Sequence, residues 1–501
     1  MKRIAILLLT LALIVSGIFV LNSCKKDNGE GEDSGKGLEF SPLPDGSYEV
    51  GAGDIKDDES IKEVTIPSTF DDTAVTQVPD GAFKDCVHIE KIVISDGVER
   101  IGKNAFEGCA SLKEIVIPDS ITEIGEYAFS GCSSLVEVTV PPSVTVIEKY
   151  TFEECSSLVS VNLPKGLVRL GDRTFENCTS LEFVEVPAGV TYMGGGSFAG
   201  CEALKSLTIP FVGNKLDEAQ NTYFGHIFGA QSSNHNATNV PKSLKTLVIT
   251  GGKRIEKDAF MGCSGLEHIS LPDTIESVSF AVFDDCKNLA FNIDGGAKYL
   301  GNDTNKYVCL YEAESKNVTS VEVKSGTKVI CDAAFSDCVS LESVSLPNGI
   351  KAIGKSTFLN CKKLSEVNIP VAVESIGEGA FNGCAALSAL AIPEGVKIIE
   401  DFAFSGCVGL VNVSLPESLT RLGSFAFGGC AALESITVPA NVTYIGVWCF
   451  QKCTSLKSAV FINKDGWTAG VTVVSATELD DAANAAKCLT DTYYSAAWKR
   501  G

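Results

Sequence analysis

Residues 128–155 read AFSGCSSLVEVTVPPSVTVIEKYTFEEC and contain one phrase twice, a phenylalanine followed three residues later by a cysteine. Phe129 precedes Cys132, and 23 residues further on Phe152 precedes Cys155. The same spacing of phenylalanines continues on both sides, at positions 83, 106, 129, 152, 175 and 198, and again at 335, 358, 381, 404, 427 and 450. A fixed period of this length is typical of proteins built from stacked structural repeats.

Each repeat contains one predicted β-strand and one extended return run. Leu135 lies six residues after its phenylalanine, Val138 and Val140 lie nine and eleven after it, and Pro141 follows at once. This alternation of apolar residues predicts a short strand, which the proline ends. The return run often closes with a glycine, as at Gly125, Gly354 and Gly423. We expect these glycines to occupy a turn that needs positive φ.

A single 23-residue coil cannot bury its own apolar positions, so each coil must lie on its neighbour. Stacking aligns the strands into a parallel sheet with a spacing of about 4.8 Å and places each phenylalanine against the next in a ladder. The predicted fold is therefore a repeat solenoid of about 16 coils of 23 residues, mostly β with short turns.

The cysteines follow the same period, since fourteen of the nineteen lie three residues after the repeated phenylalanine. Export would permit disulfides. However, equivalent side chains on stacked coils stay about 4.8 Å apart, whereas the Cβ atoms of a disulfide lie roughly 3.5 to 4.5 Å apart. We therefore interpret this column as small buried hydrophobic residues. No metal site is expected in it, because no cluster of cysteine and histidine ligands is present.

The period divides the chain into segments. Repeats are predicted at 83–210, 243–290 and 318–461, with an insertion containing a partial coil at 211–242 and an irregular coil with a protruding hairpin or loop at 291–317. Residues 38–82 are assigned to an N-terminal cap with the first coil, and residues 462–501 to a C-terminal cap. The insertions are candidate functional regions, and tolerated loop growth is the alternative.

Residues 1–23 have the layout of a signal peptide, with Lys2 and Arg3 ahead of an apolar run. The run ends in LNSC, which resembles the bacterial lipobox and implies lipid attachment at Cys24. An ordinary cleaved signal and an anchor helix are the alternatives. Residues 24–37 are polar and glycine-rich, and they predict a flexible tether. We expect an exported protein, lipid-anchored to the outer membrane at the cell surface, that meets the membrane only through this lipid.

The composition argues against several classes of function. The formal net charge of -22 disfavours nucleic-acid binding. The chain has four histidines, at positions 88, 226, 235 and 268, and none lies in a recognised nucleophile or metal motif. His226 and His235 flank the first insertion, where a shared ligand site is conceivable and two solvent-exposed loop histidines are the alternative. We expect no enzyme activity and no cofactor.

The strand positions eight and ten after each repeated phenylalanine are expected to point outward and to form the surface offered to a partner. Most are small and polar, and exposed aromatic residues among them are good anchors. The candidate binding residues are Phe183, His268, Phe291, Ser206, Thr208, Ser343 and Ser345. Such a face suits a protein or a glycan rather than a small molecule in a deep pocket. Serine and threonine as neutral strand residues are the alternative.

The phrases L-x-x-V-x-I-P and I-G-x-x-A-F-x-G-C resemble those of the BspA-like leucine-rich repeat family, and the resemblance runs from about Leu38 to the C-terminus. It implies a right-handed leucine-rich-repeat superhelix on a bacterial surface. It also implies adhesion to a protein or glycan on a host or neighbouring cell. The alternative is an architectural spacer of the cell envelope without a ligand, and a glycan-active enzyme is a remote third reading. A monomer is expected.

Overall fold

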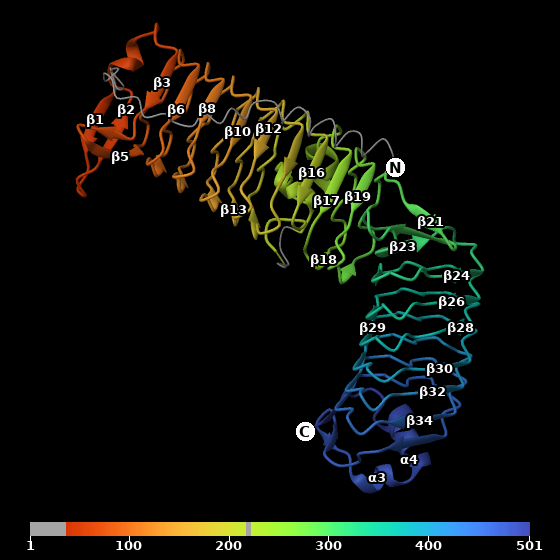
Figure 1. The fold of residues 1–501 in the computed structure, drawn as a ribbon. Coiled ribbons are helices and arrows are strands. Elements are labelled where there is room, and N and C mark those ends of the chain that lie inside the picture. Colours follow the sequence, from red (N-terminus) through yellow and green to blue (C-terminus); the bar gives the residue numbers. More distant parts are fainter. Residues whose placement is uncertain (1–36, 217–221) are drawn as a thin grey trace. The chain divides into compact units, whose positions relative to one another are not determined.

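The computed structural model describes residues 37–216 and 222–501, so the predicted signal peptide, Cys24 and nearly all of the tether lie outside the described residues. From Gly37 onward the chain forms one unit, a β-solenoid of about 18 turns of roughly 23 residues (Figure 1). The predicted repeat solenoid with a parallel sheet is confirmed, with about 18 turns where about 16 were expected. Each regular turn contributes two short strands, which stack into two separate columns.

The first column contains the strands predicted from the alternating apolar residues. In β10, for example, Val138 is buried between the exposed Glu137 and Thr139, and it lies in register with Val161 of the next turn. This column consists of β3 (Glu63–Ile66), β6 (Lys91–Ile94), β8 (Glu114–Val116), β10 (Glu137–Thr139), β12 (Ser160–Asn162), β14 (Phe183–Glu185), β16 (Ser206–Ile209), β17 (Thr246–Ile249), β19 (His268–Ser270), β24 (Ser320–Glu322), β26 (Ser343–Ser345), β28 (Glu366–Val367), β30 (Ala389–Ala391), β32 (Asn412–Ser414), β34 (Ser435–Val438) and β36 (Ser458–Phe461).

The second column is formed by the return runs and is also parallel for most of its length. Its strands have two residues each, the second of them buried. They are β7 (Arg100–Ile101), β9 (Glu123–Ile124), β11 (Val146–Ile147), β13 (Arg169–Leu170), β15 (Tyr192–Met193), β18 (Arg254–Ile255), β20 (Ser277–Val278), β25 (Val329–Ile330), β27 (Ala352–Ile353), β29 (Ser375–Ile376), β31 (Ile398–Ile399), β33 (Arg421–Leu422) and β35 (Tyr444–Ile445).

The glycines that close the return runs serve a different purpose from the one predicted. Gly125, Gly354 and Gly423 do not have positive φ. A Cβ atom on Gly125 would lie 2.6 Å from the backbone nitrogen of Lys103 in the preceding turn, and one on Gly354 would lie 2.5 Å from the carboxylate of Asp332. The positive φ angles occur two residues before and two residues after the repeated phenylalanine, as at Tyr150 (61°) and Glu154 (58°). Close contact with the preceding coil, and not a left-handed turn, therefore excludes a side chain at these glycines.

The repeated phenylalanines form the predicted ladder through the core. Their ring centroids lie 5.1 to 5.7 Å apart within each regular run of turns, in stacked arrangements, and Phe129 and Phe152 are fully buried. The column cysteines are buried beside them. They also have a role that the sequence analysis missed, because eleven of these thiols donate a hydrogen bond to the carbonyl of the phenylalanine one turn earlier, at 3.0 to 3.2 Å.

Both ends of the stack are covered by non-repeating elements. The N-terminal elements are β1 (Glu39–Pro42), β2 (Tyr48–Gly51), the 3₁₀ helix η1 (Gly53–Asp57), β4 (Thr69–Phe70) and β5 (Thr73–Val78). The C-terminal elements are β37 (Trp467–Ala469), β38 (Thr472–Val473), α3 (Ala476–Asp480), α4 (Ala482–Lys487), the π-helix η4 (Cys488–Thr492) and β39 (Trp498–Arg500). Because β39 pairs antiparallel with β35, it ends the parallel ladder, and the buried Trp467 and Trp498 close the core.

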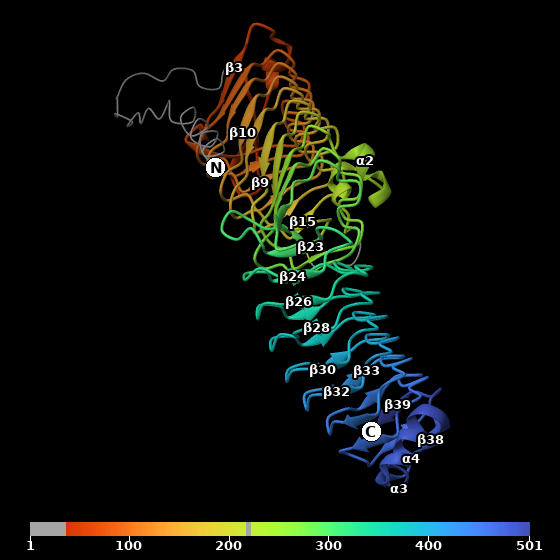
Figure 2. The same ribbon diagram turned by 90° about the vertical axis from the view of Figure 1, so that its right-hand side faces the viewer.

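The first insertion is packed into the stack. It contains the 3₁₀ helices η2 (Phe224–Phe228) and η3 (Ser233–His235) and the short helix α2 (Asn236–Asn239), which lies at the side of the stack in Figure 2. Phe228 contacts the ladder ring of Phe198, Phe224 contacts that of Phe260, and the two rings of η2 contact each other at 5.3 Å. The insertion therefore carries the aromatic ladder across the break, while β16 and β17 remain paired in register.

The second irregular region contains a hairpin, one of the two predicted forms, within a larger sheet. Strands β21 (Asn292–Asp294), β22 (Ala297–Leu300) and β23 (Cys309–Ala313) form an antiparallel meander, and β23 pairs in parallel with β25. One face of this sheet contributes Cys309 to the N-terminal core cluster, whereas the other contributes Leu310 to the C-terminal cluster. Because buried apolar residues occupy both faces of β22 and β23, these strands lie between two cores, whereas β21 is largely exposed. We call β21, β22, β23 and β25 the partition sheet.

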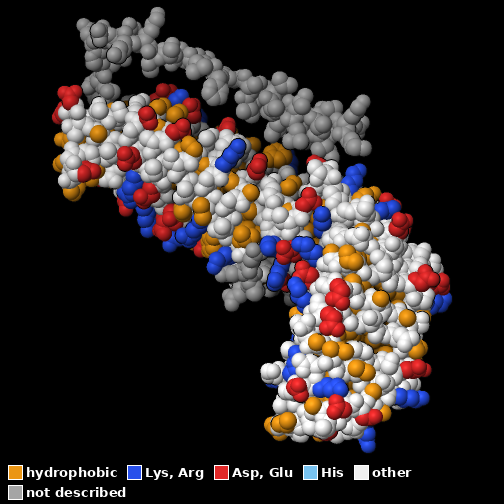
Figure 3. All heavy atoms as spheres, turned by 60° about the horizontal axis from the view of Figure 1, so that its bottom comes forward, with side chains coloured by type: hydrophobic (Ala, Val, Ile, Leu, Met, Phe, Trp, Pro, Cys, Tyr) orange, Lys and Arg blue, Asp and Glu red, His pale blue; other side chains and the backbone are white. Residues whose placement is uncertain are grey.

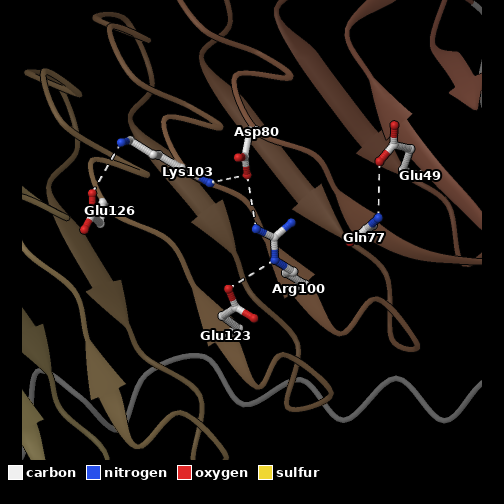
Figure 4. A network of polar contacts seen from close by, with 7 residues as sticks. All are labelled: Glu49, Gln77, Asp80, Arg100, Lys103, Glu123 and Glu126. Carbon is white, nitrogen blue, oxygen red and sulfur yellow. Dashed lines mark hydrogen bonds and ion pairs between the residues drawn. The ribbon is translucent and has the colours of Figure 1, made fainter. Parts of the chain in front are cut away.

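Charged side chains connect successive turns on the surface. Arg100 contacts Glu123 of the next turn and Asp80 of the previous one, both at 3.1 Å, and Lys103 pairs with Glu126 (Figure 4). Lysine and arginine side chains are interspersed with acidic ones along the face shown in Figure 3. Single exposed pairs contribute only about 0 to 1 kcal/mol, so their main effect is to distribute opposite charges along the stack.

Candidate functional face

The structure brings four of the predicted binding residues onto one continuous sheet. Strands β10, β12, β14, β16, β17 and β19 form a six-stranded sheet, in which Phe183 lies opposite Ser206, Ser206 opposite Thr246, and Thr246 opposite His268. The sheet spacing of about 4.8 Å then places Phe183 and His268 about 14 Å apart in one row. Thr208 lies on the same face of β16, two residues after Ser206. We call the outward side of these six strands the β10–β19 face.

This face carries more charge than the sequence analysis predicted. Glu137 begins the row that contains Phe183, and Glu185 lies opposite Thr208 in the neighbouring row. Both glutamates are exposed. The face therefore combines hydroxyl groups with two carboxylates and a histidine, and it offers both donors and acceptors of hydrogen bonds.

Phe183 is the large apolar side chain of the face, with 37% of its surface exposed. The ammonium group of Lys205, on the neighbouring turn, lies 5.9 Å from the ring centroid and pairs with Glu182 at 2.6 Å. The lysine thus holds a positive charge near the aromatic ring, an arrangement that gives a weak cation–π interaction at an exposed site. The result is an exposed ring bordered by an ion pair.

The other predicted residues lie elsewhere. Ser343 and Ser345 are on β26 of a separate three-stranded sheet, where Ser343 lies between Ser320 and Glu366. Phe291 does not point outward as predicted. It is only partly exposed and its ring stacks on that of Tyr311 at 5.0 Å, because the antiparallel partition sheet replaces the regular strand at this turn.

A second aromatic surface was missed by the sequence analysis. Phe402, Phe425 and Trp448 lie two residues before successive ladder phenylalanines, and their rings lie 4.8 and 4.9 Å apart. Their φ angles are 59°, 55° and 56°, in the left-handed region that bulky residues rarely adopt. We call these three residues the aromatic ridge. Three aromatic residues at a 23-residue spacing, where other turns have Gly196 or Gly379, are the signal that could have identified it.

The histidines of the first insertion do not form the conceivable shared site. His226 is partly buried, which lowers its pKa, and its ring lies edge-on to Tyr223 at 5.8 Å. His235 instead contacts the hydroxyl of Ser232 through Nδ1, at 2.9 Å. The two histidine rings thus contact different residues, and these contacts provide no evidence for a common ligand.

The buried thiols are poor nucleophiles in the folded protein. Burial raises the pKa of Cys201 and Cys361 to about 12, so the thiolate scarcely forms near neutral pH. Within residues 37–216 and 222–501, no group of three or more histidine, cysteine or acidic side chains is arranged to hold a metal ion. In the same ranges, no helix combines the length and apolar character that a membrane span requires.

Comparison with known proteins identifies the repeat. A family model described as "BspA type Leucine rich repeat region (6 copies)" matches residues 37–146, 76–205, 238–310, 307–397 and 374–468. No curated protein sequence matches the chain.

Three similar solved structures illustrate the range of relatives. A leucine-rich repeat protein from Bacteroides ovatus is 25% identical, with 85% of this chain and 98% of that chain covered and a TM-score of 0.35. A leucine rich cell surface protein from Faecalibacterium prausnitzii is 22% identical, with coverage of 88% and 96% and a TM-score of 0.30. A leucine rich repeat protein from T. pallidum is 24% identical, with coverage of 52% and 91% and a TM-score of 0.29.

Proposed function

The chain belongs to the BspA-type leucine-rich repeat family, and on this premise we propose that it is a surface-exposed lipoprotein that adheres to a protein or glycan partner on a host or neighbouring cell. Lipid at Cys24 would anchor it in the outer membrane, with residues 24–37 as a tether. The family's solenoid is typically a scaffold and not an enzyme.

The β10–β19 face is the observation that carries this proposal. It is an ordered, mostly polar surface with an exposed aromatic ring, Phe183, and a histidine in the same row. Binding energy in protein interfaces concentrates in a few aromatic and charged anchors, surrounded by polar contacts. A partner that covers this face can bury the Phe183 ring and form hydrogen bonds with Ser206, Thr208 and His268.

The test is binding of the purified mature chain to an array of extracellular matrix proteins and glycans. The double variant Phe183→Ala/His268→Ala should lose at least tenfold in affinity for the ligand found, because truncation of an anchor typically costs more than 1 kcal/mol. The control is Asn412→Ala/Ser414→Ala, which alters two outward residues of β32, eight and ten residues after Phe404. This control should bind normally.

The aromatic ridge gives the same experiment a second arm. If Phe183→Ala/His268→Ala binds the ligand normally and Phe402→Ala/Trp448→Ala does not, the ligand binds the aromatic ridge. Our assignment of the β10–β19 face is then wrong. If the mature chain binds nothing on the array, the architectural spacer is the better description. Protease added to intact cells should remove the protein, and full protection would contradict its placement at the surface.

A further inference from the structure

Two cysteines outside the repeated column lie in direct contact. The sulfur atoms of Cys309 and Cys331 are 3.3 Å apart, about 1.3 Å more than the length of a disulfide bond. Both side chains are buried, at 0% and 1% exposure. Each is the other's recorded hydrogen-bond partner, whereas eleven column thiols donate to phenylalanine carbonyls. The geometry thus separates this pair from the repeated cysteines.

The backbone holds the two cysteines in place. Cys309 begins β23 and lies opposite Val329 of β25, the strand that pairs with β23 in parallel, and Cys331 directly follows β25. The two cysteines are therefore diagonal neighbours, whose side chains meet at the sulfur atoms. The amide of Cys331 donates to the carbonyl of Leu310 at 2.9 Å, so both strands continue their ladder beside the sulfur atoms. Both cysteines face the N-terminal core cluster, whereas Leu310 and Ile330, which alternate with them, face the C-terminal one.

This pair lies at the discontinuity of the stack. In a solenoid each turn contacts only its neighbours, so stability depends on every interface between turns. The partition sheet is the element shared by the two core clusters, and its β23–β25 pairing joins the inserted meander to the turn that follows. A covalent link here would reinforce the place where the regular packing of phenylalanines is interrupted.

We propose that Cys309 and Cys331 form a disulfide bond as the chain folds in an oxidising compartment. The oxidant is a small-molecule or protein disulfide. The thiolate of one cysteine attacks it and releases one thiol, and the second cysteine then attacks the mixed disulfide and releases the other. Two cysteine thiols lose two protons and two electrons, and the oxidant becomes two thiols. The exchange precedes burial, because burial raises the pKa of Cys331 and closes access to both sulfurs.

The experiment is oxidative refolding of the mature chain in a buffer of reduced and oxidised glutathione. Free thiols are then alkylated under denaturing conditions, and peptides are mapped by mass spectrometry without reduction. We expect one linked pair of peptides, containing Cys309 and Cys331, with the column cysteines alkylated. Cys109 and Cys132, on successive turns, are the internal control, because each of their thiols donates to a carbonyl. Alkylation of both Cys309 and Cys331, or their linkage to other cysteines, overturns the proposal.

A second measurement does not depend on mapping. The oxidised wild-type chain should unfold at a higher denaturant concentration than the same protein after reduction, since a cross-link constrains the unfolded chain. The variant Cys309→Ala/Cys331→Ala should unfold at one midpoint with and without reductant. An equal shift in wild type and variant would contradict the proposal. The proposed export supplies the oxidising compartment in the cell, whereas the refolding experiment does not depend on it. If the disulfide does not form, the ligand-binding test of the proposed function is unaffected.

Discussion

At the scale of the residue, each turn depends on positions where side-chain size or backbone conformation is restricted. Closing glycines such as Gly125 and Gly423 lie close to the backbone of the preceding turn, and the left-handed positions that flank each phenylalanine accept glycine, asparagine or aspartate most readily. The column cysteine satisfies a second requirement, because it fills a small volume and donates to a buried carbonyl. These restrictions explain why the repeat retains particular residues and not only an apolar pattern.

Substitution of Gly446 tests the close backbone contact. A Cβ atom there would lie 2.3 Å from the amide nitrogen of Ser424. We expect Gly446→Ala to lower the free energy of unfolding by about 1 to 3 kcal/mol, as overpacking does in other cores. Gly51→Ala is the control, since a Cβ atom there would have no atom within 4 Å apart from its chain neighbours, and its φ is not positive. Urea denaturation of both variants gives the comparison, and equal stability would refute the explanation.

The aromatic ridge allows stability to be separated from binding. Replacing Phe425 with asparagine relieves a left-handed backbone by about 1 to 2 kcal/mol and loses two ring contacts of about 0.5 to 1.5 kcal/mol each. We therefore expect Phe425→Asn to lower the free energy of unfolding by no more than about 2 kcal/mol. Phe427→Ala, two residues away in the buried ladder, should lose about 3 to 5 kcal/mol. If Phe425→Asn and Phe427→Ala lower the free energy of unfolding by comparable amounts in chemical denaturation, the aromatic ridge has a structural role.

At the scale of the element, the two irregular regions behave as parts of the core. Helix η2 supplies two rings that replace one ladder position, and the partition sheet places apolar residues on both faces. Neither region is a loop added to a complete solenoid. Parallel pairing of β16 with β17 continues across the first insertion because Phe224 and Phe228 maintain the spacing between turns.

This role of η2 predicts that Phe228→Ala is as harmful as loss of a repeated phenylalanine. Phe228 is 1% exposed and contacts both Phe198 and Phe224. We expect the variant to lose about 3 to 5 kcal/mol in chemical denaturation. Gln231→Ala, an exposed change in the same insertion, should stay within about 0.5 kcal/mol. A near-neutral Phe228→Ala would indicate a tolerated loop.

At the scale of the whole molecule, the repeated thiols act together. Burial raises the pKa of Cys201, Cys286, Cys361 and Cys453 to about 12, from an ordinary value of 9.0. The unfolded chain therefore releases these protons before the folded chain does. Their contribution to stability is complete below about pH 9 and is lost as the pH rises toward 12.

We expect the stability of the solenoid to fall steeply between pH 9 and 11. Each such thiol contributes a slope of about 1.4 kcal/mol per pH unit in this range. Denaturant titrations at pH 8, 9 and 10 measure the total dependence of the free energy of unfolding on pH. The variant Cys361→Ala should reduce this slope by the contribution of one thiol. A midpoint that is unchanged from pH 8 to pH 10 would show that these thiols ionise freely in the folded chain.

The sequence alone determined the solenoid, the parallel strands, the phenylalanine ladder and the burial of the cysteine column. The reason is periodicity: when every turn has the same length, equivalent residues stack on each other and one repeat predicts its neighbours. Inward and outward positions of the regular strands follow from the same rule, which is why Phe183, Ser206, Thr208 and His268 could be placed on one face.

Only the tertiary structure decided what happens where a segment has no copy to stack on. The replacement of a ladder ring by Phe224 and Phe228, the inward position of Phe291 and the contact of Cys309 with Cys331 depend on distances between residues that no period relates. The hydrogen bonds from eleven column thiols and the close contact at Gly125 likewise depend on how far one turn is offset from the next. That offset is set by packing in three dimensions, which residue spacing along the chain does not contain.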